Sequence, residues 1–159
     1  MKISIVAVGT IKDRFYKEGI EEYTKRLSRF CQLELIESKE EPIPEKARDA
    51  QILQIKQKET KNALKHVHAA SVLIVLDVNG KPLDSVAFAE KINGFMLEGK
   101  SHLTFLIGGS CGLCESALQK ADMRLSMSKM TFPHRLARLI LTEQIYRAFK
   151  IIKGETYHK

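Results

Sequence analysis

The sequence has 159 residues, which suits one domain able to bury about two thirds of the surface that its unfolded chain exposes. Lysine and arginine total 26 against 19 acidic residues, and the net charge of +7 suits a phosphate-rich partner without identifying one. No apolar run reaches the ~18 residues of a membrane span, the N-terminus lacks the pattern of a secretory signal, and the 3 cysteines form no disulfide framework. We therefore expect a single cytoplasmic domain over residues 1–159 with no membrane partner.

The first half of the chain alternates predicted strands and helices. Residues 2–8 are a β-branched apolar run of strand length, residues 33–37 are a weaker one, and apolar residues recur at helical spacing between them. After two prolines, residues 45–68 are predicted to form a long and mostly polar helix. Its predicted inward residues are Ile52, Ile55 and Leu64.

The second half repeats the alternation with more apolar strands. Residues 71–76 and 102–107 are apolar almost throughout, which predicts strands buried on both faces. A turn at Asn79–Gly80 and a helix over 84–97 are expected to follow the first of them. The remaining predicted elements are a short helix from Glu115, a strand over 123–127 and a helix over 134–152. The expected fold class is α/β, with a parallel-type sheet flanked by helices.

The last predicted helix and the tail beyond it carry two kinds of signal. Its apolar stripe consists of Leu141, Ile145, Phe149 and Ile152. Such a stripe either joins the core or forms a seam between subunits, and the basic residues elsewhere on the helix either contact RNA phosphates or are only solvated. The tail would ordinarily be frayed, yet Tyr157 offers a face for base stacking, His158 an imidazole and Lys159 a cation.

Unusual sequence follows three predicted strands, after Leu76, at Gly108–Gly109 and across residues 128–132. Ligands of α/β sheets bind beyond the carboxyl ends of strands, so we expect these three loops to share one pocket. Glycine at position 108 would let a ligand approach the backbone closely, although a tight turn alone would also explain an isolated pair of glycines.

Two other chemistries fit the same loops less well. The glycines lack the G-x-G-x-x-G spacing of a dinucleotide site, and no carboxylate stands about 20 residues beyond them for a ribose. Cys111 and Cys114 form a C-x-x-C pair at a predicted helix start, where redox or metal chemistry is conceivable. Structural zinc requires four ligands and the sequence offers no second pair, so we expect no metal.

Four segments are most informative when they are taken together: Ile107–Ser110, Leu125–His134, Glu143–Ala148 and Tyr157–His158. They resemble the ribosomal RNA large subunit methyltransferase H family of the SPOUT superfamily, and the similarity extends from Met1 to Lys159. The run S-K-M-T-F-P-H within the second segment is the most specific match. The chain departs from the pattern at Cys111 and Cys114, where more polar residues are expected.

The resemblance implies a deep trefoil knot near the C-terminus, a topology that general folding rules would not suggest. We also expect a homodimer, because one domain is not expected to cover the apolar stripe of the last helix fully. It implies S-adenosylmethionine bound in the knot, and methylation at N3 of a pseudouridine in the 23S rRNA of the large subunit or the assembled ribosome. The implied cofactor contacts are Leu76, Gly108, Met127, Ser128, Lys129, Met130, Thr131 and Phe132.

The implied reaction requires alignment of the methyl group with N3, removal of the N3 proton and a base held in place. Positioning of two reactants can contribute ~7–11 kcal/mol, so binding geometry is expected to provide most of the acceleration. We assign His158 as base or proton relay, Tyr157 as stacking platform, and Arg147 with Glu143 as an orienting pair. We also expect the pocket of one subunit to use the tail of the other.

Two alternative functions stay open on the sequence alone. A noncatalytic RNA- or ribosome-binding protein would explain the basic C-terminal quarter without any cofactor. A thiol or metal protein based on Cys111 and Cys114 would depend on those two side chains.

Overall fold

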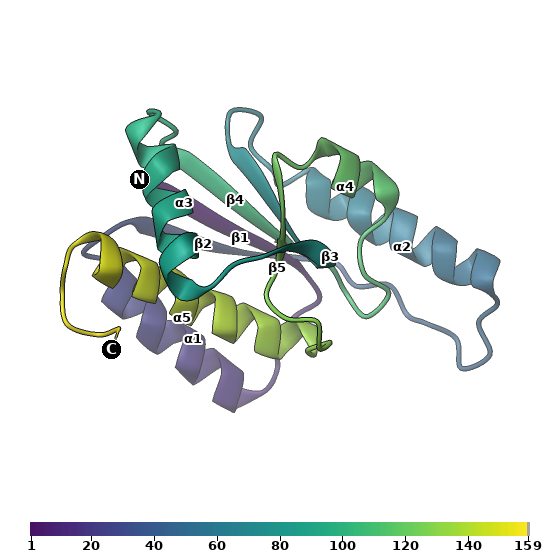
Figure 1. Cartoon of the computed structure of the whole chain (residues 1–159). Coiled ribbons are helices and arrows are strands. Elements are labelled where there is room, and N and C mark those ends of the chain that lie inside the picture. The colour runs from purple at the N-terminus through teal and green to yellow at the C-terminus, as the bar shows by residue number, and fades with distance from the viewer. Residues whose placement is uncertain (159) are drawn as a thin grey trace.

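The computed structural model describes residues 1–158 and shows one five-stranded parallel sheet in the order β2-β1-β4-β3-β5 (Figure 1). The strands are β1 Lys2–Val8, β2 Gln32–Ser38, β3 Val72–Pro82, β4 His102–Ile107 and β5 Met123–Ser126. The helices are α1 Arg14–Leu27, α2 Asp49–Leu64, α3 Ser85–Leu97, α4 Glu115–Lys120 and α5 His134–Ile152. The predicted α/β class and parallel sheet are confirmed.

Helices cover both faces of the sheet. Helices α1, α3 and α5 lie on one face, and α2 with α4 lies on the other (Figure 1). Alternate residues of β1 enter opposite cores, because Ile3 and Ile5 pack beneath α5 and α1 while Val6 and Val8 pack beneath α2 and α4. Burial on both faces explains why this strand is apolar throughout.

Strand β3 is longer than its apolar run predicts. It extends to Pro82, so Asn79 and Gly80, the residues of the predicted turn, lie inside the strand, where its register against β5 shifts between Leu76 and Lys81. Gly80 permits this close pairing, since a Cβ atom there would lie 2.7 Å from the Arg124 backbone. The hydrophobic pattern stops at Leu76 and could not reveal pairing that depends on the backbone.

Helix α2 begins and ends inside the predicted range of 45–68. Of the predicted inward residues, Leu64 is half-buried and packs against the core, whereas Ile52 and Ile55 are half-buried and do not belong to it, so the expectation was right only for Leu64. The buried residues of α2 are instead Glu59, Thr60 and Ala63. Polar side chains are buried here because they bond loop backbone, as Thr60 Oγ1 does by accepting from the Cys114 N–H at 3.1 Å.

The apolar stripe of α5 belongs to the core. Leu141, Ile145 and Phe149 are fully buried beneath the α1 and α3 side of the sheet, and Ile152 is half-buried beside them. The expectation that this stripe is left uncovered for a second subunit was therefore wrong.

No helix within residues 1–158 is long and apolar enough to cross a membrane.

Candidate functional site

A cavity of about 640 Å³ opens where the loops after β4 and β5 meet the irregular part of β3. Its size suits a nucleoside-sized ligand. The predicted contacts that line it are Leu76, Gly108, Met127, Ser128, Met130, Thr131 and Phe132. The structure thus brings the three predicted segments together in one pocket, as the rule for parallel α/β sheets requires.

The cavity lining lacks one of the predicted contacts and contains several residues that were not predicted. Lys129 is exposed and lies outside the lining, although its neighbours on both sides face the cavity. The lining also includes residues that were not predicted as cofactor contacts, among them Ser110, Pro133, His134 and Ala137. Ser110 directly follows Gly108–Gly109, and the other three lie at the start of α5. Extending the predicted contact segments by a few residues would have included them.

Gly108 lines the cavity, but the loop requires glycine there for its own packing. A Cβ atom at position 108 would lie 2.8 Å from the carbonyl carbon of Gly112 and 3.0 Å from Leu113 Cγ. The Gly112 N–H donates to the Gly109 carbonyl oxygen at 2.9 Å, and Gly112 has φ +75°, which keeps the loop tight. This contact supports the tight-turn explanation of Gly108, and the close approach of a ligand to its backbone stays a prediction.

A buried acid lies behind the glycine loop. Glu59 is 1% exposed, and its Oε1 accepts from the Glu41 N–H at 2.8 Å. Its Oε2 has no hydrogen-bond partner among residues 1–158 and lies 3.1 Å from the position of a Cβ atom on Gly109. Burial raises the pKa of Glu59, and the neighbouring carboxylates of Glu40 and Glu41 raise it further. The polar pattern of α2 gave no signal for this residue.

Hydrogen bonds hold the loop after β5 against the end of β3. The Ser126 hydroxyl lies 3.0 Å from the Val78 carbonyl oxygen and 3.1 Å from that of Ser128. The Ser128 hydroxyl accepts from the Met130 N–H at 2.9 Å, while the Met130 side chain is exposed. These hydrogen bonds fix the shape of this wall of the cavity, to which Val78, Met127, Ser128 and Met130 contribute.

The four predicted catalytic residues form a second cluster near the C-terminal end of α5. Arg147 Nη2 donates to Glu143 Oε1 at 2.6 Å, and the Tyr157 hydroxyl donates to the same oxygen at 3.1 Å. The Arg147 guanidinium lies 4.7 Å from the Tyr157 ring centre, and its Nη1 is 3.4 Å from His158 Nδ1. The structure therefore brings these residues together, while Lys159 lies outside the described residues.

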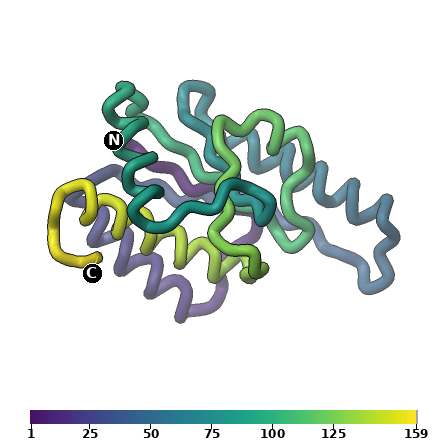
Figure 2. Tube along the Cα trace, in the orientation of Figure 1, coloured from purple at the N-terminus to yellow at the C-terminus, as the bar shows by residue number. Residues whose placement is uncertain are grey.

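The tail folds back along α5 instead of fraying (Figure 2). Burial raises the pKa of Tyr157, and the nearby Tyr23 and the hydrogen bond to Glu143 raise it further, so the hydroxyl stays a donor. The Tyr157 ring also contacts Tyr146 edge to face, with 4.9 Å between ring centres.

The cavity and the tail cluster are separate within one chain. The cavity lining extends along α5 only as far as Ala137, and none of the four clustered residues belongs to it. Glu143 and Arg147 lie six and ten residues further along, which is ~9–15 Å along a helix axis. As far as residue 158, the tail does not line the cavity of its own chain.

Residues 1–158 match the family model described as "Predicted SPOUT methyltransferase". The chain belongs to the SPOUT methyltransferase family. Relatives named ribosomal RNA large subunit methyltransferase H are 53% identical in Ruminiclostridium cellulolyticum and 46% identical in Enterococcus faecalis, each over 159 residues and 100% of both chains. A putative protein of that name from Methanococcus maripaludis is 47% identical over the same length. The resemblance found in the sequence is confirmed, and this SPOUT protein is an enzyme.

A solved structure supports the fold of this SPOUT methyltransferase. It is described as a probable methylase family protein from Haemophilus influenzae Rd KW20, with a TM-score of 0.55 and 16% sequence identity. The match covers 99% of this chain and 70% of the other. At this identity the likeness concerns the fold alone.

The cysteine pair of this SPOUT methyltransferase shows no metal geometry. Cys114 is buried and its sulfur lies 3.0 Å from the Ser116 hydroxyl, whereas Cys111 is only partly buried. Across residues 1–158, no three His, Cys, Asp or Glu side chains converge as a metal site would require.

Proposed function

We propose that this SPOUT methyltransferase uses S-adenosylmethionine to methylate N3 of a pseudouridine in the 23S rRNA of the large ribosomal subunit, acting in the cytoplasm. The observation that carries the proposal is that every implied cofactor contact except Lys129 lines one cavity. Relatives that match over the whole chain are named for methylation of large-subunit ribosomal RNA.

The cavity fits such a methyl donor by its size and its mixed lining. Leu76, Met127 and Phe132 offer apolar surface for a flat base, and the backbone of the glycine loop offers polar groups for a ribose or an amino acid. The donor supplies a methyl group on a positively charged sulfur, which makes that carbon electrophilic. The chain holds the donor in position for transfer, and this chemistry requires no metal.

The tail cluster supplies the groups that act on the RNA base. We assign His158 to accept or relay the N3 proton, while the ring of Tyr157 stacks on the base. One oxygen of Glu143 accepts from both Arg147 and Tyr157, so Glu143 and Arg147 together fix the orientation of the Tyr157 ring.

We propose that the enzyme works as a homodimer in which the tail of one subunit completes the cavity of the other. The separation between cavity and tail cluster within one chain supports this arrangement. We further propose the trefoil knot of the family, on the strength of family membership alone.

Calorimetry and mass mapping test the reaction. S-adenosylmethionine should bind the purified protein with measurable heat, and 23S rRNA from a deletion strain should lose one methyl group at a pseudouridine. A protein that binds rRNA without heat from the donor would support the noncatalytic alternative. Unchanged rRNA in the deletion strain would refute the substrate.

Subunit mixing tests the composite site. Gly108→Val protein is combined with protein lacking residues 157–159, under conditions that exchange subunits, so that about half the dimers are mixed. Each mixed dimer contains one intact cavity facing one intact tail, and activity should recover to about a quarter of wild type. No recovery would show that a tail serves its own cavity. Light scattering that finds a stable 18.1 kDa monomer would refute the dimer itself.

A further inference from the structure

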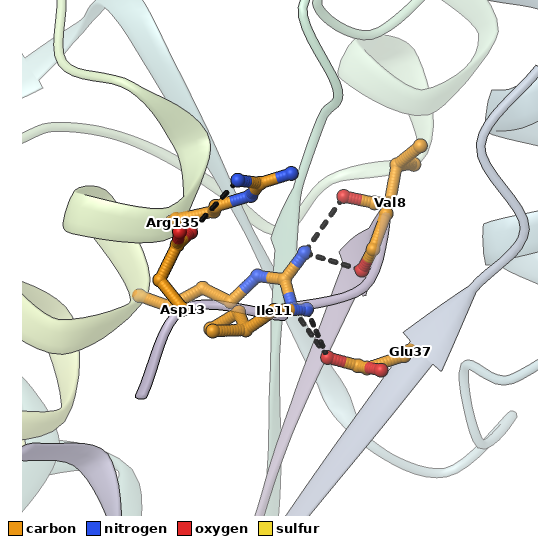
Figure 3. A network of polar contacts seen from close by, with 7 residues as sticks. Val8, Ile11, Asp13, Glu37 and Arg135 are labelled. Carbon is orange, nitrogen blue, oxygen red and sulfur yellow. Dashed lines mark hydrogen bonds and ion pairs between the residues drawn. The ribbon is translucent and has the colours of Figure 1, made fainter. Parts of the chain in front are cut away.

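Arg138 is a buried arginine that the proposed reaction does not use. It is 4% exposed and lies on α5, one residue beyond the cavity-lining Ala137. Its Nη2 donates to the carbonyl oxygens of Val8 at 2.8 Å and Gly9 at 2.6 Å, and its Nη1 lies 3.1 Å from Glu37 Oε1. Figure 3 draws this network of polar contacts and labels Val8 and Glu37 in it. A buried guanidinium with such partners fixes its neighbours firmly, because its donors form a rigid fork.

The groups that Arg138 binds lie at the carboxyl ends of β1 and β2. Gly9 turns the chain after β1 with φ +89°, and a Cβ atom there would lie 3.2 Å from His134 Nε2. Glu37 Oε1 also accepts from the Ile11 N–H at 2.9 Å, so one carboxylate joins the arginine to the chain beyond this turn. Arg138 thus ties the start of α5 to the turn after β1.

Val8 connects this tie to the opposite wall of the cavity. Its carbonyl oxygen accepts from Arg138, while its side chain would lie 3.0 Å from a Cβ atom on Gly109. On the other side, Pro133, His134 and Ala137 line the cavity from the first turn of α5. Val8 therefore contacts both walls of the cavity. The wall formed by the start of α5 reaches it through Arg138, and the glycine loop packs directly against its side chain.

We propose that Arg138 is a positioning residue that sets the spacing between the glycine loop and the start of α5, and thereby the affinity for the methyl donor. The inference rests on the proposed function, since the ligand is S-adenosylmethionine. Arg138 itself does not line the cavity, so it acts through Val8 and through its own helix.

Arg135 offers a matched control one turn earlier on the same helix. Its Nη1 donates to Asp13 Oδ2 at 2.8 Å, with 35% of the Arg135 side chain and 51% of the Asp13 side chain exposed. The two arginines carry the same charge and each has a carboxylate partner, but only Arg138 reaches the backbone of β1. A pair as exposed as Arg135 and Asp13 contributes little.

The test compares Arg138→Gln, Arg138→Lys and Arg135→Gln with the wild-type protein. Calorimetry gives the Kd for S-adenosylmethionine well below the melting temperature, and circular dichroism verifies folding. Arg138→Gln should weaken binding by at least about tenfold, Arg138→Lys by less because it keeps the charge and one bond, and Arg135→Gln by no more than about twofold. Hydrogen exchange should rise at residues 108–112 only in the Arg138 variants, which a loss of overall stability would not reproduce.

The outcomes separate this inference from the proposed function. A wild-type protein that does not bind S-adenosylmethionine overturns both. Wild-type binding together with an unchanged Kd in folded Arg138→Gln overturns the role of Arg138 and leaves the proposed function intact. If Arg138→Gln does not fold, Arg138→Lys decides, because a wild-type Kd and wild-type exchange at 108–112 in that variant overturn the inference.

Discussion

The two ends of α5 differ in how completely the polar groups around them are hydrogen-bonded. At its start, His134 lines the cavity and its Nε2 is buried without a hydrogen-bond partner among residues 1–158, and Glu59 Oε2 behind the adjacent loop shares this state. Near its other end, Glu143 joins Arg147 and Tyr157 in one set of bonds. Unmet bonding capacity around a cavity is typical of a ligand site, whereas a satisfied cluster keeps its own shape.

A second set of contacts anchors the tail end. Glu155 accepts from Lys150 Nζ at 2.6 Å and from Arg29, and its N–H donates to the Lys150 carbonyl oxygen at 2.9 Å. Lys150 is 9% exposed, so this contact is screened less than an ordinary surface pair. The tail end is therefore preassembled by side chains, and the cavity end is built mainly by loops.

The largest expected effect is the loss of donor binding at the cavity end of α5 when Gly108 is replaced. Gly108→Val should abolish donor binding, because its side chain would collide with the Gly112 backbone and open the loop. Gly94→Ala is the control, since nothing lies within 4 Å of a Cβ atom there and alanine should stabilise α3 by roughly 0.5–1 kcal/mol. Calorimetry and thermal melting measure both variants. Wild-type affinity in Gly108→Val would show that the loop tolerates a side chain.

The next effect concerns the tail end alone. Glu143→Gln removes the charge that holds Arg147 and Tyr157, and methylation should fall by roughly tenfold or more while the donor Kd stays unchanged. Glu22→Gln breaks an exposed pair with Arg26 and should alter neither. Single-turnover methylation of rRNA and calorimetry provide the two readouts. Loss of donor binding in Glu143→Gln would mean that the two ends of α5 are coupled.

A smaller effect concerns the buried acid at the cavity end. Because burial raises the pKa of Glu59 in the folded protein, stability should fall as pH rises from the unfolded pKa of the carboxyl through its folded pKa. Glu59→Gln should remove this dependence and raise the melting temperature at neutral pH by about 2–4 °C per kcal/mol gained. Melting curves between pH 4 and 8 provide the measurement. Parallel pH profiles for wild type and variant would contradict the raised pKa.

The smallest effect is expected for the cysteines beside the glycine loop. Replacement of both Cys111 and Cys114 by serine should leave methylation within about twofold of wild type, because neither thiol has a role in positioning the reactants. Initial rates at saturating donor measure the outcome. A large loss would revive the thiol-based alternative.

Much of the fold and part of the site could be predicted from particular segments. Residues 2–8, 102–107 and 134–152 form β1, β4 and α5 with the predicted boundaries, because buried strands and an amphipathic helix leave strong local patterns. The three loops of the cavity were expected from their places after strands. The inward side of α2 was not predictable, since Glu59 and Thr60 are buried by bonds to distant loops.

The sequence by itself determined the parallel α/β sheet, the family and the segments that line the cavity, because each depends on local periodicity or on motifs contiguous in the chain. Only the tertiary structure decided that Arg138 binds the end of β1, that Gly108 packs against Gly112, and that the tail folds onto Glu143. Arg138 and Val8 are 130 residues apart, and Tyr157 and Glu143 are 14. Such contacts depend on how packed elements place distant backbone and side-chain atoms, which no local pattern of residues records.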